Sequence, residues 1–222
     1  MSKIAENLQA INAKIKKISQ ATEVIAVSKN HPAESVKEAI AAGQTLFGEN
    51  RVQEAQSKFA ELKKEFPNIK LHLIGPLQTN KVKDALALFD VIQTLDREKL
   101  AIKVAEANTK QHSNIATKQL FIQVNIGNEP QKAGIASAQT ADFYKFCTAD
   151  LGLNVTGLMC IPPVDEPPTA FFTELKNLSL KLGTNNLKLS MGMSADYEIA
   201  AKLGANYVRI GTAIFGERLK TP

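Results

Sequence analysis

Eight short apolar runs that alternate with segments of helical periodicity constrain the fold of this chain more than any other feature. Such runs, β-branched or apolar and bounded by glycine or polar residues, are typical of parallel strands in α/β proteins. The predicted strands are 24–28, 45–47, 71–74, 91–94, 120–125, 155–159, 187–190 and 207–210. The predicted helices are 4–18, 33–42, 53–66, 79–88, 97–108, 136–149, 169–182 and 195–203.

Eight successive β/α units favour a closed barrel over an open doubly wound sheet. Barrels of this kind run from roughly 200 residues upward, and this chain of 222 residues leaves little length for insertions. We therefore predict an α/β fold, a single (β/α)8 TIM barrel over residues 1–222, with one extra helix before the first strand. Segment 161–168 contains four prolines and is predicted to form a rigid loop after the sixth strand.

The composition indicates an ordinary globular protein. Hydrophobic residues make up 44% of the chain, which is enough to build a full core. The two cysteines, Cys147 and Cys160, have neither a C-x-x-C nor a Cys/His spacing, so we expect both to be reduced and buried and expect no metal site. Residues 1–17 lack the apolar stretch of a signal peptide, and no later segment is apolar for long enough to cross a membrane. These features predict a cytoplasmic protein.

The chain carries a formal net charge of +5, and its densest basic cluster is Lys14, Lys16 and Lys17. No aromatic side chains are interleaved with this cluster, and no nucleic-acid-binding motif accompanies it. We therefore predict a solvated helix face and no nucleic-acid partner. A pocket for an anionic small molecule would use part of the positive surplus.

In a β/α barrel the chemistry lies at the carboxyl ends of the strands. The first predicted strand leads to Lys29, which has the same parity as Ile25 and Val27 and so points inward if those residues fill the barrel. A desolvated ammonium group loses its charge or gains a partner, and an amine of lowered pKa can attack an aldehyde to form a Schiff base. The alternative is a lysine whose side chain extends to solvent.

The loops after the last two strands resemble a phosphate-binding pair. They contain Ser194, before a predicted helix, and Gly211 with Thr212. In barrels of this class these two loops often bind phosphate through backbone N–H groups and hydroxyls. Taken singly, Ser194 is equally well an N-cap and Gly211 a turn residue; their occurrence at both expected loops favours a phosphate site.

Three further residues near strand ends are candidates for the site. Arg209 has the parity of Tyr207 and is expected to face inward, where its guanidinium can only donate hydrogen bonds. It would leave a facing pyridine nitrogen unprotonated, or else form a buried salt bridge. Asn50 could hydrogen-bond a ring oxygen. His72 could line the cavity, although a hydrogen-bonded core histidine is the preferred interpretation.

The neighbours of Asn50 and the remaining histidines receive no functional assignment. We expect Glu49 and Arg51 to pair on the rim of the barrel. His31 and His112 are expected to be exposed and without a role.

Several motifs occur together and in order along the chain. They are A-V-S-K-N-H-P, F-G-E-N-R-V-Q-E, H-L-I-G-P-L-Q-T-N-K, S-M-G-M-S-A-D-Y-E-I-A and V-R-I-G-T-A-I-F-G. With them the chain resembles, over essentially its full length, the YggS/PROSC family of pyridoxal phosphate homeostasis proteins. The resemblance implies a barrel like the N-terminal domain of alanine racemase, with pyridoxal 5′-phosphate (PLP) bound as a Schiff base.

The resemblance also implies roles for individual residues. It makes Lys29 the Schiff-base lysine, and it makes Ser194, Gly211 and Thr212 the phosphate ligands. Arg209 becomes the partner of the pyridine nitrogen, and Asn50 lies near the cofactor.

Two classes of function share this barrel: a non-catalytic PLP carrier and an amino-acid racemase. Racemisation needs acid/base groups on both faces of the substrate, and in alanine racemase a tyrosine from a separate β domain supplies the second group. The chain stops at Pro222, and none of Tyr144, Tyr197 and Tyr207 is an obvious substitute. Arg209 also implies an unprotonated pyridine, which is a weak electron sink.

We therefore predict a monomeric carrier involved in vitamin B6 homeostasis, which supplies PLP-dependent apo-enzymes. A phosphosugar-converting barrel enzyme is a third alternative, and it predicts no visible chromophore.

Overall fold

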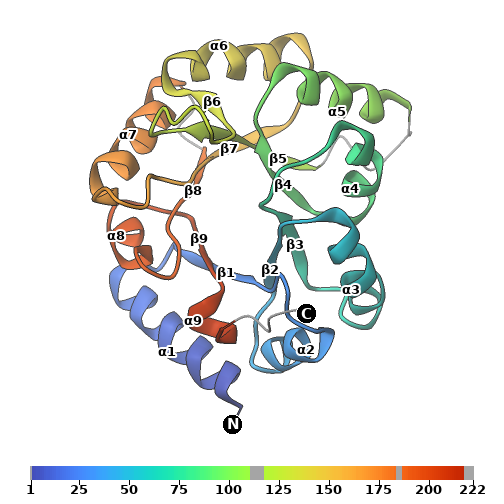
Figure 1. The fold of residues 1–222 in the computed structure, drawn as a ribbon, viewed down its shortest axis with the longest axis vertical. Helices are drawn as coiled ribbons and strands as arrows, with labels where there is room; N and C mark the ends of the chain where they lie inside the picture. The colour runs from blue at the N-terminus through green and yellow to red at the C-terminus, as the bar shows by residue number, and fades with distance from the viewer. Residues whose placement is uncertain (1, 111–117, 184–186, 218–222) are drawn as a thin grey trace.

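Eight parallel strands close into a barrel in the computed structural model, which describes residues 2–110, 118–183 and 187–217. The strands pair in chain order, β1 pairs with β9 and β4 pairs with β5, so the ring has no open edge. Figure 1 shows this inner ring surrounded by helices. The strands are β1 Glu23–Val27, β2 Leu46–Glu49, β3 Lys70–Leu73, β4 Val91–Leu95, β5 Gln119–Asn125, β7 Val155–Cys160, β8 Lys188–Ser190 and β9 Tyr207–Ile210. The predicted TIM barrel is confirmed.

The helices cover the outside of the barrel. They are α1 Lys3–Ile18, α2 Ala33–Ala41, α3 Val52–Glu65, α4 Val82–Leu88, α5 Glu98–Lys110, α6 Thr140–Lys145, α7 Pro168–Lys181, α8 Tyr197–Lys202 and α9 Thr212–Phe215. The helix predicted over 136–149 is instead a 3-10 turn, α6 and a π-helical turn over Phe146–Asp150. Two elements were not predicted: α9 and the two-residue strand β6, Ile135–Ala136, which pairs with β5.

The core has two layers, as alternating strand residues require. Ile25, Phe121 and Tyr207 belong to a small cluster inside the barrel. Ala26 follows Ile25 along β1, and Val208 follows Tyr207 along β9. Both belong to the large cluster between the strands and the helices. The prediction that Ile25 in the first strand and Tyr207 in the last strand face the barrel interior is therefore confirmed.

The extra helix α1 packs against α2, α8 and α9 on the outside of the barrel. Asn7 donates a hydrogen bond of 2.9 Å from Nδ2 to the carbonyl of Ile214 in α9. Lys14, Lys16 and Lys17 lie on the exposed face of α1, as predicted for a solvated basic cluster. Among the described residues, no helix combines the length and the apolar character that a membrane span requires.

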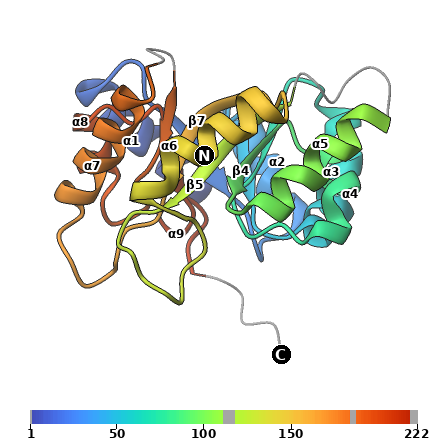
Figure 2. The ribbon, with the colours of Figure 1, turned by 90° about the horizontal axis from the view of Figure 1, so that it is seen from above.

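The segments that follow β5 and β7 extend from the barrel on the same side as α9 (Figure 2). The loop after β7 is the predicted proline-rich segment, and it ends where α7 begins at Pro168. Both cysteine thiols are free and buried, as predicted. Burial raises the pKa of each thiol to about 12, so neither is a reactive thiolate at neutral pH.

Candidate functional site

A cavity of about 320 Å³ opens at the carboxyl end of the barrel. This volume is at the lower end of the roughly 300–1,000 Å³ typical of small-molecule sites. All six residues singled out from the sequence line it: Lys29, Asn50, Ser194, Arg209, Gly211 and Thr212. The described lining also contains Val27, His31, Ile74, Ile161, Met193 and Ala195, and it includes no carboxylate. The cavity therefore suits an anionic ligand with an apolar body.

The pairing of the first and last strands brings Lys29 and Arg209 to one cavity. Ile25 lies opposite Arg209 in the parallel register of β1 and β9, and Lys29 follows two residues beyond the end of β1. Lys29 is half-buried. Residues near both ends of the chain thus meet at the barrel mouth.

Arg209 is buried and anchored by neutral oxygens. Its Nη1 donates to Ser190 Oγ at 2.8 Å, and its Nη2 donates to the carbonyl of Cys160 at 2.7 Å. Within the described residues no carboxylate forms an ion pair with it, so the alternative of a barrel salt bridge is wrong. Burial lowers the pKa of the guanidinium from its ordinary value, and an anionic ligand in the cavity would offset this desolvation.

The loop that carries Ser194 is fixed to strand β9. Gly192 accepts a hydrogen bond of 2.9 Å from the backbone N–H of Arg209. Its φ is +91°, and a Cβ there would lie 2.5 Å from the Cβ of Ala200, so only glycine fits. The backbone N–H of Met193 donates to Asp196 Oδ1, which closes the turn around Ser194.

The second loop forms the start of α9. The carbonyl of Gly211 accepts hydrogen bonds of 2.8 Å from Ile214 N and 2.9 Å from Phe215 N. The first backbone N–H groups of a helix have no acceptor within that helix. Gly211 and Thr212 both line the cavity, so this loop faces the same space as Ser194.

His72 is a hydrogen-bonded core histidine, as preferred from the sequence. Its Nδ1 lies 2.9 Å from Gln93 Nε2, and its ring packs edge-on against Tyr207. Burial lowers its pKa to about 3, so the ring is neutral at pH 7. It lines a different cavity, at the amino end of the barrel.

The expectation of a Glu49–Arg51 pair on the rim is wrong. Glu49 has the parity of Phe47 and is fully buried against α3, where its Oε1 accepts from Ser28 Oγ at 2.7 Å and from Lys58 Nζ at 2.9 Å. Arg51 is exposed and precedes α3. The sequence suggested a partner for Glu49 two residues along the chain, in Arg51. In the fold its partner is Lys58, from the adjacent helix α3.

The expectation for His31 is also wrong. His31 is buried and lines the cavity, and its ring stacks on Phe215 with the centroids 5.1 Å apart. Phe215 belongs to the unpredicted helix α9, so no local signal pointed to this contact. His112 lies outside the described residues.

Comparisons with known proteins agree with this geometry. The model of the family described as "Alanine racemase, N-terminal domain" matches residues 1–219. A Vibrio cholerae protein named "Pyridoxal phosphate homeostasis protein" is 39% identical over 98% of each chain.

Comparison with solved structures finds similar proteins of the same kinds. PipY of Synechococcus elongatus, in a structure with PLP bound, has a TM-score of 0.84 and 34% identity over 96% of this chain and 100% of its own. An alanine racemase from Clostridium difficile shares the fold alone, with a TM-score of 0.73 and 16% identity over 97% of this chain and 58% of its own. The barrel, its motifs and these matches together place the chain in the YggS/PROSC family of pyridoxal phosphate homeostasis proteins, within the larger family of alanine racemase N-terminal domains.

Proposed function

We propose that this protein binds PLP at the carboxyl end of its barrel, with Lys29 as the covalent attachment point, and acts in vitamin B6 homeostasis. The observation that carries the proposal is the lining of the cavity: one lysine, one buried arginine, two small-residue loops and no carboxylate among the described residues. The presence of PLP in the structure of PipY, a relative of similar length, supports it.

Lys29 supplies the amine. The PLP aldehyde condenses with a primary amine to form a Schiff base and releases water. Lys29 Nζ has to be unprotonated to attack the aldehyde carbon.

The other lining residues suit the remaining parts of the cofactor. Ser194 and Thr212 offer hydroxyls, and Gly211 brings its backbone close without a side chain, which is what a phosphate dianion requires. Arg209 would donate to the pyridine nitrogen, and Asn50 to the ring oxygen. A donor facing the pyridine nitrogen keeps that nitrogen unprotonated.

We propose that the protein is a monomeric carrier that supplies PLP to PLP-dependent apo-enzymes and has no independent catalytic activity. None of the described lining residues is a tyrosine that could act as the second acid/base group of a racemase. Tyr207 instead lies at the other end of the barrel, where its hydroxyl accepts a hydrogen bond of 2.9 Å from Lys188 Nζ. Relatives named as homeostasis proteins support this role.

The test is a PLP titration of the purified protein followed by borohydride reduction and peptide mass mapping. We expect a visible absorption band and a reduced adduct on the peptide that contains Lys29, both lost in Lys29→Ala. Lys37→Ala is the matched control, because Lys37 is an exposed lysine paired with Glu65 on the outer helices. An adduct that persists in Lys29→Ala would refute the attachment point, and stereospecific deuterium exchange at the Cα of alanine would refute the carrier role.

A further inference from the structure

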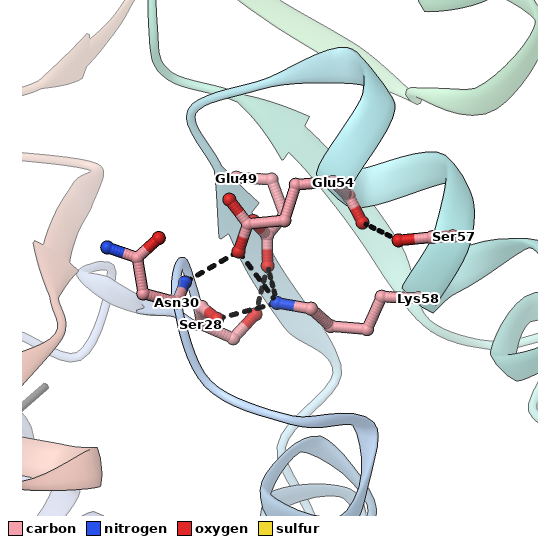
Figure 3. Close-up of polar contacts among 6 residues, drawn as sticks. All are labelled: Ser28, Asn30, Glu49, Glu54, Ser57 and Lys58. Carbon is pink, nitrogen blue, oxygen red and sulfur yellow. Dashed lines mark hydrogen bonds and ion pairs between the residues drawn. The ribbon is translucent and has the colours of Figure 1, made fainter. Parts of the chain in front are cut away.

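A buried lysine outside the cavity holds the backbone on which Lys29 sits. Lys58, on α3, is only 7% exposed. Its Nζ donates to the carbonyl of Ser28 at 2.7 Å, to Glu49 Oε1 at 2.9 Å and to Glu54 Oε1 at 3.3 Å (Figure 3). The three acceptors come from the end of β1, the end of β2 and α3 itself, so one ammonium group joins three elements.

These contacts lie on both sides of Lys29 along the chain. Before it, Ser28 is held twice, through its carbonyl by Lys58 and through its Oγ by Glu49. After it, the backbone N–H of Asn30 donates to Glu54 Oε1. Asn30 has a φ of 61°, a left-handed conformation that is uncommon outside glycine and needs support from its surroundings. The network therefore fixes the peptide groups that flank Lys29.

We infer that Lys58, acting with Glu49 and Glu54, is a positioning residue that aims Lys29 into the cavity and sets the affinity for PLP. The inference rests on the proposed function, but the network itself is a property of the cofactor-free chain. None of the three residues lines the cavity, so each acts through the backbone of residues 28–30.

The two carboxylates of the network favour a lysine at position 58. Glu49 and Glu54 place two carboxylates around one ammonium group, and Glu49 Oε2 is buried without a hydrogen-bond partner in the described structure. Burial raises the pKa of Glu49, an effect that the charge of Lys58 opposes. Without Lys58, the buried carboxylate would lose its counter-charge and the Ser28 carbonyl would lose a donor, which loosens the segment that carries Lys29.

The test compares Lys58→Met with Lys63→Met. Lys63 is a matched control: it lies on the same helix and likewise bridges a carbonyl and a carboxylate, Leu88 O at 2.9 Å and Asp90 Oδ2 at 2.8 Å, but at a site away from Lys29. The first measurement is amide hydrogen exchange without PLP. We expect the Asn30 amide to exchange at least about tenfold faster in Lys58→Met and to stay at the wild-type rate in Lys63→Met.

The second measurement is PLP affinity. We expect Lys58→Met to bind PLP about tenfold more weakly, as is typical when a supporting hydrogen-bond partner of a site residue is removed. Glu54→Ala, at a partly exposed position, is expected to show the same faster exchange and weaker binding, and Glu54→Gln, which keeps an oxygen acceptor, is expected to behave like the wild type.

Wild-type exchange at Asn30 and wild-type affinity in both Lys58→Met and Glu54→Ala would overturn the inference. An equal loss of affinity in Lys63→Met would also overturn it, because the effect would then be general destabilisation. If the wild-type protein forms no adduct on Lys29, the proposed function fails, and the exchange experiment still decides whether the network orders residues 28–30.

Discussion

Arg209 donates a hydrogen bond of 2.8 Å from Nη1 to the Oγ of Ser190, the last residue of the adjacent strand β8. Ser190 in turn donates to Gln93 Oε1 at 2.7 Å, and Gln93 Nε2 lies 2.9 Å from His72. A chain of polar side chains therefore crosses the barrel interior from β9 to β3. It orients the guanidinium beneath the cavity before any ligand arrives, so recognition at this position requires little rearrangement.

Arg209→Lys should destabilise the protein although it keeps the charge. Lysine cannot reach Ser190 Oγ and the Cys160 carbonyl simultaneously in fork geometry, and each lost buried bond costs about 1–3 kcal/mol. Urea unfolding measures the change in the free energy of unfolding. Arg51→Lys, at an exposed position, should stay within about 0.5 kcal/mol of wild type. Equal stability of Arg209→Lys and wild type would contradict the anchoring described above.

Ser194→Ala and Thr212→Val should weaken PLP binding and leave pyridoxal binding unchanged. Pyridoxal lacks the phosphate, so only PLP uses these hydroxyls. The net contribution of one hydrogen bond, about 0.5–1.5 kcal/mol, corresponds to a loss of roughly two- to tenfold per variant. Absorbance titrations with both compounds check this, with Thr173→Val on the outer helix α7 as control. A parallel loss for pyridoxal would place the hydroxyls away from the phosphate.

The stability of the protein should fall as the pH falls from 6.5 toward 3, in part because of His72. Its folded-state pKa of about 3 lies below the ordinary value of 6.5, so in this window the unfolded chain binds a proton that the buried ring does not. This one group contributes a loss of about 1.5 kcal/mol between pH 6.5 and pH 5. Denaturant unfolding at both pH values should show a smaller loss for His72→Gln than for wild type. Identical losses would mean that His72 is protonated in the folded protein.

Gly192→Ala should destabilise the protein more than Gly43→Ala. Both glycines have a φ near +90°, but a Cβ at Gly43 meets nothing within 4 Å, whereas at Gly192 it would lie 2.5 Å from Ala200. Backbone strain alone costs about 1 kcal/mol, and the clash adds roughly 1–3 kcal/mol. Thermal unfolding of the two variants separates these contributions. Equal costs would show that the loop before Ser194 shifts freely.

The strands and their inward residues were predictable from the sequence because alternation along a strand is a local property. Ile25 and Arg209 face the interior as their parity requires, and that parity brought Lys29 and Arg209 to one cavity. Helix α9 was not predictable by periodicity, since four residues make only one turn. The stacking of His31 on Phe215 depends on that helix and was missed with it.

The network around Lys58 could not be predicted for a related reason. Lys58 lies nine residues after Glu49 and thirty after Ser28, and it meets them only because α3 packs back on the barrel. The sequence offered Glu49 a closer partner in Arg51, but Glu49 is buried at the end of β2, whereas Arg51 lies beyond that strand and is exposed before α3. Pairings of this kind follow from tertiary packing rather than from spacing.

The closure of β1 on β9 has a consequence for biosynthesis. Lys29 is synthesised well before Arg209, Gly211 and Thr212, and the register of Ile25 with Arg209 forms only once β9 has emerged from the ribosome. A nascent chain therefore has no complete cavity until β9 and the loop after it have been translated. Premature termination between Lys29 and β9 therefore yields a product that has Lys29 but lacks the residues of β9 and its following loop that complete the cavity.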